Sequence, residues 1–255
     1  MTVRRSLAQT IPTTNDELYN WIKYVLKRTV PNVAVCPNHS SPFDFIADAY
    51  FDRFFHALAV ANRGGSKTMS AGLLTTVNGL TKPGCETFIV GSTRHQANYC
   101  YEHVRDCLLD EALKDTFIEL LKERISWKNK SRLHIGTQSI RGVSGAHPQK
   151  GIADEVEEWE WIVLQHFMGI PLEKHDIKAQ MLYLSTRHRL FGPMSKLWEE
   201  AETRGIKKYI WCIFETMESC KVPQNEKEKC PLFPSCKNVN CQLSNGFRKK
   251  DEIVQ

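Results

Sequence analysis

The most informative absence in this sequence is that of a long hydrophobic run. No apolar stretch of the 255-residue chain approaches the roughly 18–20 residues that span a bilayer. The first twenty residues hold two arginines but no apolar core behind them, which argues against a signal peptide. Repeats and low-complexity segments are also missing. These absences predict an intracellular globular protein without a membrane partner.

The composition narrows the class only a little. Hydrophobic residues make up 42% and charged residues 25% of the chain, which is ordinary for a globular protein. The length suffices for one large α/β domain or two small ones. A net charge of +5 is compatible with a polyanionic partner, although a solvated basic face gives the same balance.

Short apolar runs alternate with segments of helical composition. We expect strands within 56–62, 86–93, 131–138, 150–161, 180–188 and 207–216, the fourth of which runs into acidic residues. We expect helices from the capping residues Thr14 and Ser41, and within 67–78, 95–124 and 194–205. This alternation predicts an α/β fold with a central, mainly parallel sheet flanked by helices.

The stretch "NRGGSKTMSAG" lies between an expected strand and an expected helix. Gly64 and Gly65 allow backbone N–H groups to turn inward, Lys67 can reach the β- and γ-phosphates, and the Thr68 hydroxyl can hold Mg²⁺. The positive N-terminal end of the following helix also favours a phosphate. These features predict a phosphate-binding loop.

The loop departs from the strict pattern G-x-x-x-x-G-K-[ST]. That pattern would place glycine at Ala61 and at Ser66. The alternative is a Gly-Gly turn with an exposed lysine, and both interpretations stay open at this point.

Two further segments end expected strands in polar residues. "GIADEVEEW" supplies Asp154, to face a metal ion, and Glu155, to face an attacking water. The alternative is an acidic helix N-terminus, which the helix dipole favours. "MLYLSTRH" ends in Ser185 and Thr186, whose hydroxyls can sense a γ-phosphate or simply cap a strand.

These three segments, in this order, resemble motifs of the ATPase domain of the large terminase subunit of tailed bacteriophages. "NRGGSKT" resembles its variant Walker A motif, "GIADEVEEW" its Walker B motif with the catalytic glutamate, and "LYLSTRH" its coupling motif. "VGSTRHQANYCYEHV" is similar to the segment after its second strand, and "CPNHSSPFDFIADAYF" lies where the family places adenine contacts. The resemblance covers roughly residues 35 to 215.

The resemblance implies a P-loop NTPase fold of the RecA-like (ASCE) type that hydrolyses ATP to ADP and phosphate with Mg²⁺. Glu155 would be the general base, and Arg141, within "SIRGVSGAHP", the candidate arginine finger acting on a neighbouring subunit. The alternative for Arg141 is an exposed loop arginine. The implied nucleotide and Mg²⁺ contacts are Arg63, Gly64, Gly65, Ser66, Lys67, Thr68, Asp154, Ser185 and Thr186, with Thr68 and Asp154 on the metal and Arg63 acting in its own subunit.

The family also implies partners and a location. Its members move double-stranded DNA into a preformed capsid, as a ring on the capsid portal, together with a terminase small subunit. The expected location is the cytoplasm of an infected bacterial host. We expect DNA to be gripped through its phosphates, without sequence readout.

The nine cysteines form two groups. Cys36, Cys85, Cys100, Cys107 and Cys212 stand among apolar neighbours and are expected to be buried small hydrophobes. The others crowd into one polar stretch, whose thiolates suit Zn²⁺ or, as the alternative, an Fe–S cluster. These four are Cys220, Cys230, Cys236 and Cys241. Free thiols in an exposed loop are a further alternative.

We therefore expect an ATPase core over residues 1–218, a Cys-rich metal-binding segment over 219–245, and a linker over 246–255 that leads toward a nuclease domain not seen in this sequence. DNA cutting is not expected of this chain. The alternatives are a helicase-type motor fragment, a non-hydrolysing nucleotide- or zinc-binding interaction module, and, more remotely, a small-molecule kinase.

Overall fold

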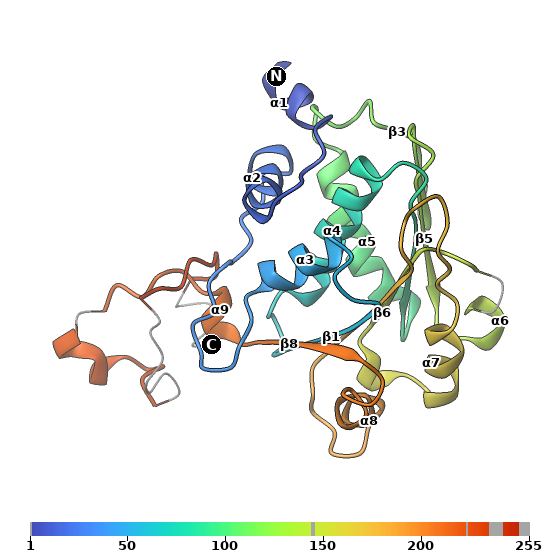
Figure 1. The fold of residues 1–255 in the computed structure, drawn as a ribbon. Helices are drawn as coiled ribbons and strands as arrows, with labels where there is room; N and C mark the ends of the chain where they lie inside the picture. The colour runs from blue at the N-terminus through green and yellow to red at the C-terminus, as the bar shows by residue number, and fades with distance from the viewer. Residues whose placement is uncertain (1, 144–145, 223, 235–241, 250–255) are drawn as a thin grey trace.

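The computed structural model describes residues 2–143, 146–222, 224–234 and 242–249. Within these residues, eight strands form one sheet (Figure 1). The strands are β1 (His56–Ala61), β2 (Glu86–Gly91), β3 (Phe117–Leu120), β4 (Arg124–Trp127), β5 (Arg132–Thr137), β6 (Lys150–Asp154), β7 (Gln180–Ser185) and β8 (Ile206–Trp211). Their order across the sheet is β3-β4-β5-β2-β6-β7-β1-β8.

The helices precede, connect and follow these strands, and two of them begin where the capping signals predict. Ser41 forms a complete capping box with Asp44, and the Thr14 side chain accepts a hydrogen bond from the backbone of Glu17. The α-helices are α1 (Thr2–Leu7), α2 (Asn15–Val25), α3 (Pro42–Tyr50), α4 (Lys67–Thr81), α5 (Arg94–Leu108), α6 (Ile140–Val143), α7 (Trp161–Met168), α8 (Pro193–Glu199) and α9 (Ile213–Thr216). The 3₁₀ helices are η1 (Val156–Glu158) and η2 (Gln224–Lys229).

The sheet is mainly parallel, as predicted. Every neighbouring pair from β5 across to β8 is parallel, whereas β3 pairs with β4, and β4 with β5, in antiparallel fashion. Parallel strands end at the same edge of a sheet, so the loops that follow β1, β6 and β7 gather at one edge. That edge carries the polar residues singled out in the sequence.

The prediction of a helix through residues 95–124 is wrong in its second half. α5 ends at Leu108, and the following residues form the β3–β4 hairpin. The Leu, Glu and Lys residues of this segment favour a helix locally. Burial of Ile125 and Trp127 against the sheet and α4 outweighs that preference, and the Trp127 ring packs directly on Gly79.

Both faces of the sheet are covered by helices (Figure 1). Because side chains alternate along a strand, Ala57 and Ala59 join the core formed with α2 to α5. Leu58 points the other way, into a second core with α7 and α8. This double coverage explains why the central strands are almost continuously apolar. In the described part of the chain, no helix is both long and apolar enough to cross a bilayer.

Candidate phosphate-binding site

The loop between β1 and α4 folds back tightly on the end of β1. Gly64 has a positive φ of 72°, and the Gly65 N–H donates to the Asn62 carbonyl at 3.0 Å. A Cβ atom on Gly65 would lie 2.7 Å from the Ala61 Cβ and 2.9 Å from that carbonyl oxygen. The two glycines therefore meet two needs, a left-handed turn at 64 and close packing at 65.

Ser66 forms the loop despite replacing the glycine of the strict pattern. It is left-handed, with a φ of 62°, a conformation that costs a non-glycine residue about 1–2 kcal/mol. Its side chain makes no capping hydrogen bond to α4. The first N–H groups of α4 thus keep their capacity to bind an anion.

Lys67 is buried at the base of this loop and is only 5% exposed. Its Nζ donates to the carbonyl oxygens of Ala61 and Asn62 at 3.1 and 3.2 Å. An ammonium has three protons, so one remains for another acceptor. Burial lowers the pKa of Lys67, while the charges of Glu155 and Asp154 oppose that shift.

Thr68 and Asp154 meet across the sheet edge. The Thr68 hydroxyl lies 3.1 Å from Oδ2 and 3.4 Å from Oδ1 of Asp154, although β7 separates their strands. Asp154 is 2% exposed; burial and the adjacent Glu155 raise its pKa to about 7, against the opposing effects of Thr68 and Lys67. A hydroxyl and a carboxylate side by side are the oxygen ligands that Mg²⁺ prefers.

Glu155 turns sharply away from the end of β6. Its φ is 50°, which is left-handed and unusual for this residue type, and its N–H donates to Asp154 Oδ1 at 3.1 Å. The residue lines the pocket, and its carboxylate has no hydrogen-bond partner among the described residues. An uncommitted carboxylate at a pocket wall can accept a proton from water.

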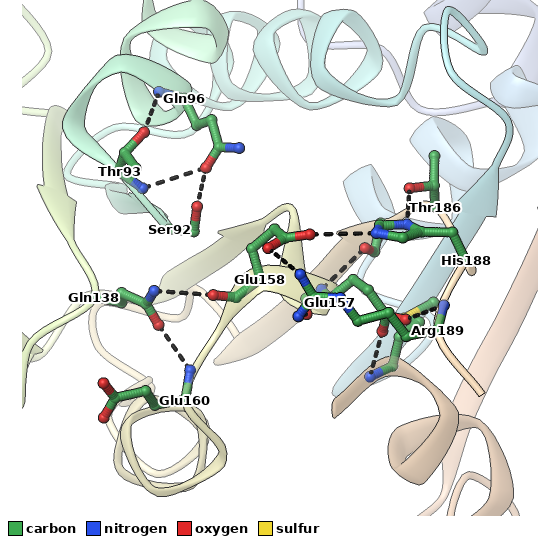
Figure 2. A network of polar contacts seen from close by, with 12 residues as sticks. Ser92, Thr93, Gln96, Gln138, Glu157, Glu158, Glu160, Thr186, His188 and Arg189 are labelled. Carbon is green, nitrogen blue, oxygen red and sulfur yellow. Dashed lines mark hydrogen bonds and ion pairs between the residues drawn. The ribbon is translucent and has the colours of Figure 1, made fainter. Parts of the chain in front are cut away.

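The remaining acids of this run have different partners (Figure 2). Glu157 is fully buried and accepts hydrogen bonds from the backbone N–H groups of Arg189 and Met194. Glu158 pairs with His188 at 3.2 Å and with Arg189 at 2.6 Å. These two glutamates brace the β7–α8 loop, a role that the sequence analysis missed. The basic run 187–189 was the available signal.

The hydroxyls at the end of β7 also differ from each other. Thr186 lines the pocket, and its Oγ1 lies 3.0 Å from His188 Nδ1. Ser185 is fully buried and accepts a hydrogen bond from the Glu157 N–H at 3.0 Å. The structure therefore places Thr186 at the pocket surface and Ser185 behind it.

These residues surround a pocket of about 900 Å³. Arg63, exposed on the loop, lines it, whereas Arg141, exposed on α6, does not. Two residues of the expected linker also line it, Phe247 and Arg248. The Arg248 guanidinium packs on Gly64, only 2.7–2.8 Å from where a Cβ would lie, and its Nε has no partner among the described residues. Nothing in the local sequence indicated this approach.

A second hollow of about 560 Å³ adjoins the loop between β1 and α4. His39 lines it together with Asn62 and Arg63 of the loop. Part of the segment expected to contact adenine therefore lies beside the glycine loop that is expected to contact phosphates. The Trp211 indole N–H donates to the Gly65 carbonyl and holds the end of β8 against the loop.

The burial of the cysteines agrees with the prediction at three positions and differs at two. Cys85, Cys100 and Cys107 are buried, as expected, but Cys36 and Cys212 are only partly buried. Together with His39 and Glu215 they form a polar cluster that could hold a metal ion. In the Cys-rich segment, Cys220 and Cys230 are free thiols, and Cys236 and Cys241 lie outside the described residues.

Comparison with solved structures defines the fold class. The large terminase of bacteriophage HK97 matches 95% of this chain with a TM-score of 0.60 at 12% identity. The chain spans 50% of that terminase, about half its length. The fold is thus that of a phage large terminase, which confirms the predicted resemblance at the level of architecture.

Two other phage terminases give weaker matches. The large terminase ATPase domain of Thermus phage P74-26 matches 74% of this chain and 88% of its own, with a TM-score of 0.49 and 12% identity. The large terminase of another thermophilic bacteriophage, in complex with ADP, matches 70% of this chain and 44% of its own, with a TM-score of 0.49 and 9% identity. No protein-family model matches the sequence, and no curated protein does.

Proposed function

We propose that this chain is an ATP-hydrolysing motor domain that drives double-stranded DNA into a viral capsid, of the kind found in phage large terminases. The contact between the Thr68 hydroxyl and Asp154 at 3.1 Å carries the proposal. It lies in a pocket that also presents Lys67 and Glu155. The shared fold with the HK97 large terminase supports the same assignment.

The residues present suit ATP and Mg²⁺. The phosphates would be held by Arg63, Lys67 and the backbone N–H groups of Gly64, Ser66, Lys67 and Thr68, with Gly65 closing the turn and the N-terminus of α4 behind them. Thr68 and Asp154 would hold Mg²⁺, which when bound offsets phosphate charge. The buried Nε of Arg248, which lacks a partner among the described residues, offers a further donor at Gly64.

The chain's own side chains divide the remaining work. Glu155 accepts the proton of the attacking water, because its carboxylate is uncommitted. Lys67 offsets negative charge on the phosphates. Thr186, in the β7–α8 loop, couples the pocket through His188 to Glu158 of η1 (Figure 2). Ser185 contributes from behind, by fixing the backbone of Glu157.

Arg141 would act on the nucleotide of a neighbouring subunit. It is exposed on α6 and does not line its own pocket. A positive charge delivered only when subunits meet makes hydrolysis depend on the assembled ring. Double-stranded DNA, a capsid portal and a terminase small subunit are the proposed partners, and the four-cysteine metal site of residues 219–245 remains a prediction.

The first experiment measures phosphate release from ATP with Mg²⁺. We expect Lys67→Ala and Glu155→Ala each to abolish turnover, and Glu155→Ala to retain nucleotide binding. Glu160→Ala is the matched control, because this exposed glutamate of the same region does not line the pocket. No nucleotide binding by the wild type would leave the loop as a simple turn and favour an interaction module.

A second experiment tests the arginine. The Arg141→Ala variant has an intact pocket but lacks the arginine, whereas the Glu155→Ala variant has the arginine but a defective pocket. If Arg141 acts between subunits, mixing the two inactive variants at high concentration restores part of the turnover. Mixing Lys67→Ala with Glu155→Ala should restore none, because both defects lie in the same pocket. Equal behaviour of the two mixtures would contradict the role of Arg141.

A further inference from the structure

We infer that Cys36, His39, Cys212 and Glu215 form a Zn²⁺ site, named here the cysteine corner. One ligand atom from each of the four residues lies within 4.8 Å of all the others. The residues come from the loop before α3 and from the segment after β8, which are far apart in the sequence. This proposal is independent of ATP hydrolysis.

Two of the distances lie close to the edges of a zinc coordination tetrahedron. Cys36 Sγ lies 3.6 Å from Cys212 Sγ, and His39 Nδ1 lies 3.0 Å from Glu215 Oε2. With Zn–S bonds of about 2.3 Å and Zn–N or Zn–O bonds of about 2.0–2.1 Å, tetrahedral edges are about 3.8 and about 3.3–3.4 Å. These two distances fall within a few tenths of an ångström of such edges, and all four ligand atoms lie within 4.8 Å of one another.

The Glu215 carboxylate is oriented by the backbone. Its Oε1 accepts hydrogen bonds from the N–H groups of Cys36 at 2.7 Å and Val35 at 3.2 Å, and its Oε2 accepts from the N–H of Cys212 at 2.7 Å. These three bonds use neither the His39 ring nor the two thiol groups. A metal held by the four residues would replace the contact between His39 and Glu215 and the contacts of the two thiols, while the backbone donors would keep the carboxylate in place.

Two short spacings hold the ligands rigidly. Cys36 and His39 are separated by two residues, as are Cys212 and Glu215. Cys212 is the N-cap of α9 and Glu215 lies in its first turn. The Ser40 N–H donates to the Ile210 carbonyl at 2.7 Å and ties the first pair to β8.

The donor set selects the metal class. Two sulfurs, one imidazole nitrogen and one carboxylate oxygen suit a borderline-soft cation in tetrahedral geometry, which is Zn²⁺ rather than Mg²⁺ or Ca²⁺. The site is shielded, since the Glu215 side chain is 0% and the His39 side chain 21% exposed. Four protein ligands leave no coordination position open for water or substrate, which indicates a structural ion and not a catalytic one.

The position of the corner suggests what the ion stabilises. Cys212 follows Trp211, whose indole N–H holds the Gly65 carbonyl, and His39 lines the hollow beside Arg63. A bound ion would fix the loop before α3 against this side of the phosphate loop.

The test uses the full chain carrying Cys220→Ser and Cys230→Ser, so that the Cys-rich segment cannot supply four thiolates. The reduced, chelator-treated protein is dialysed against Zn²⁺, and its metal content is measured by atomic spectroscopy. We expect one equivalent, and at least about a hundredfold weaker binding after adding either Cys36→Ser or Cys212→Ser. Glu218→Gln, an exposed glutamate nearby, serves as the control that leaves binding unchanged.

Cobalt provides a second measurement that needs no further variant. Co²⁺ in the same chain should give the absorption of a tetrahedral site and a charge-transfer band of two thiolates. The proposal is overturned if the chain binds no stoichiometric Zn²⁺, if Cys36→Ser and Cys212→Ser leave the affinity intact, or if the band does not correspond to two thiolates. It is also overturned if a pair of thiols reacts only after reduction, because that indicates a disulfide between Cys36 and Cys212.

Discussion

Asp154 in the pocket beside the β1–α4 loop and Glu215 in the cysteine corner are both buried carboxylates, one at the end of β6 and one after β8, yet their pKa values shift in opposite directions. Asp154 is 2% and Glu215 0% exposed. Burial and the charge of Glu155 raise the pKa of Asp154 to about 7. Burial also raises the pKa of Glu215, but hydrogen bonds from Cys212, His39 and Cys36 outweigh it, so that the pKa falls below its usual value.

The difference lies in how the surroundings compensate the negative charge. Glu215 accepts hydrogen bonds from three backbone N–H groups. These donors lie in the loop before α3 and after β8, so the carboxylate links the two segments. Asp154 has the Thr68 hydroxyl and the N–H of Glu155, and it faces a second carboxylate. The Thr68 hydroxyl and the charge of Lys67 do not offset burial and the charge of Glu155, and carboxylates with a pKa raised in this way cluster at functional sites.

The largest effect on the stability of the folded chain is expected from a change of pH, acting through Asp154. Its pKa is raised in the folded chain, so the folded state binds more protons than the unfolded state between about pH 4 and pH 7. Stability without Mg²⁺ should therefore fall as pH rises through that window. At 1.36 kcal/mol per pKa unit, the loss reaches at most about 4 kcal/mol at and above pH 7.

Urea unfolding of wild type and Asp154→Asn at several pH values checks this. The asparagine variant should lack the decline, and Asp176→Asn, at an exposed position, should keep it. Added Mg²⁺ should narrow the gap between wild type and Asp154→Asn at high pH. If the difference in stability between wild type and Asp154→Asn does not depend on pH, the pKa of Asp154 is not raised by folding, and the contrast with Glu215 is contradicted.

The second effect concerns Glu215. Glu215→Gln places an amide group where backbone N–H groups need acceptors, so the metal-free, reduced chain should lose about 2–4 kcal/mol of stability. Denaturation midpoints in the presence of a chelator measure this. Glu218→Gln should change stability by less than about 0.5 kcal/mol. A tolerated Glu215→Gln would mean that the carboxylate does not brace the corner.

The smallest effect is expected at Ser66. Its left-handed backbone suits glycine better, so Ser66→Gly should raise stability by roughly 0.5–1 kcal/mol. Thermal unfolding of wild type and variant would detect the shift. A loss of stability would show that the serine side chain contributes to the loop in a way that its backbone conformation does not reveal.

Much of the architecture could be predicted because its signals are local. The apolar runs that became β1, β2 and β7 stand between turns, and Gly64, Gly65 and Lys67 stand between a strand and a helix. Capping residues marked the starts of α2 and α3 correctly. Such patterns depend on neighbours within a few residues, so a single sequence displays them.

Other features depended on distant partners and were missed. The β3–β4 hairpin has a helix-like composition, and only burial against the sheet makes it extended. Arg248 reaches Gly64 from the opposite end of the chain. The run from Asp154 to Glu158 looks uniform, but its four acids acquire separate roles from the partners that the fold brings to each.

The sequence by itself determined the α/β class, the position of the glycine loop between β1 and α4, and the strand end that carries Asp154 and Glu155, because strand, turn and helix preferences act over short stretches. Tertiary structure alone decided that Cys36 and His39 meet Cys212 and Glu215, because their approach requires the loop before α3 to lie beside the end of β8. The same reason applies to protonation, since the pKa of a carboxylate depends on burial and donors that only the completed fold supplies.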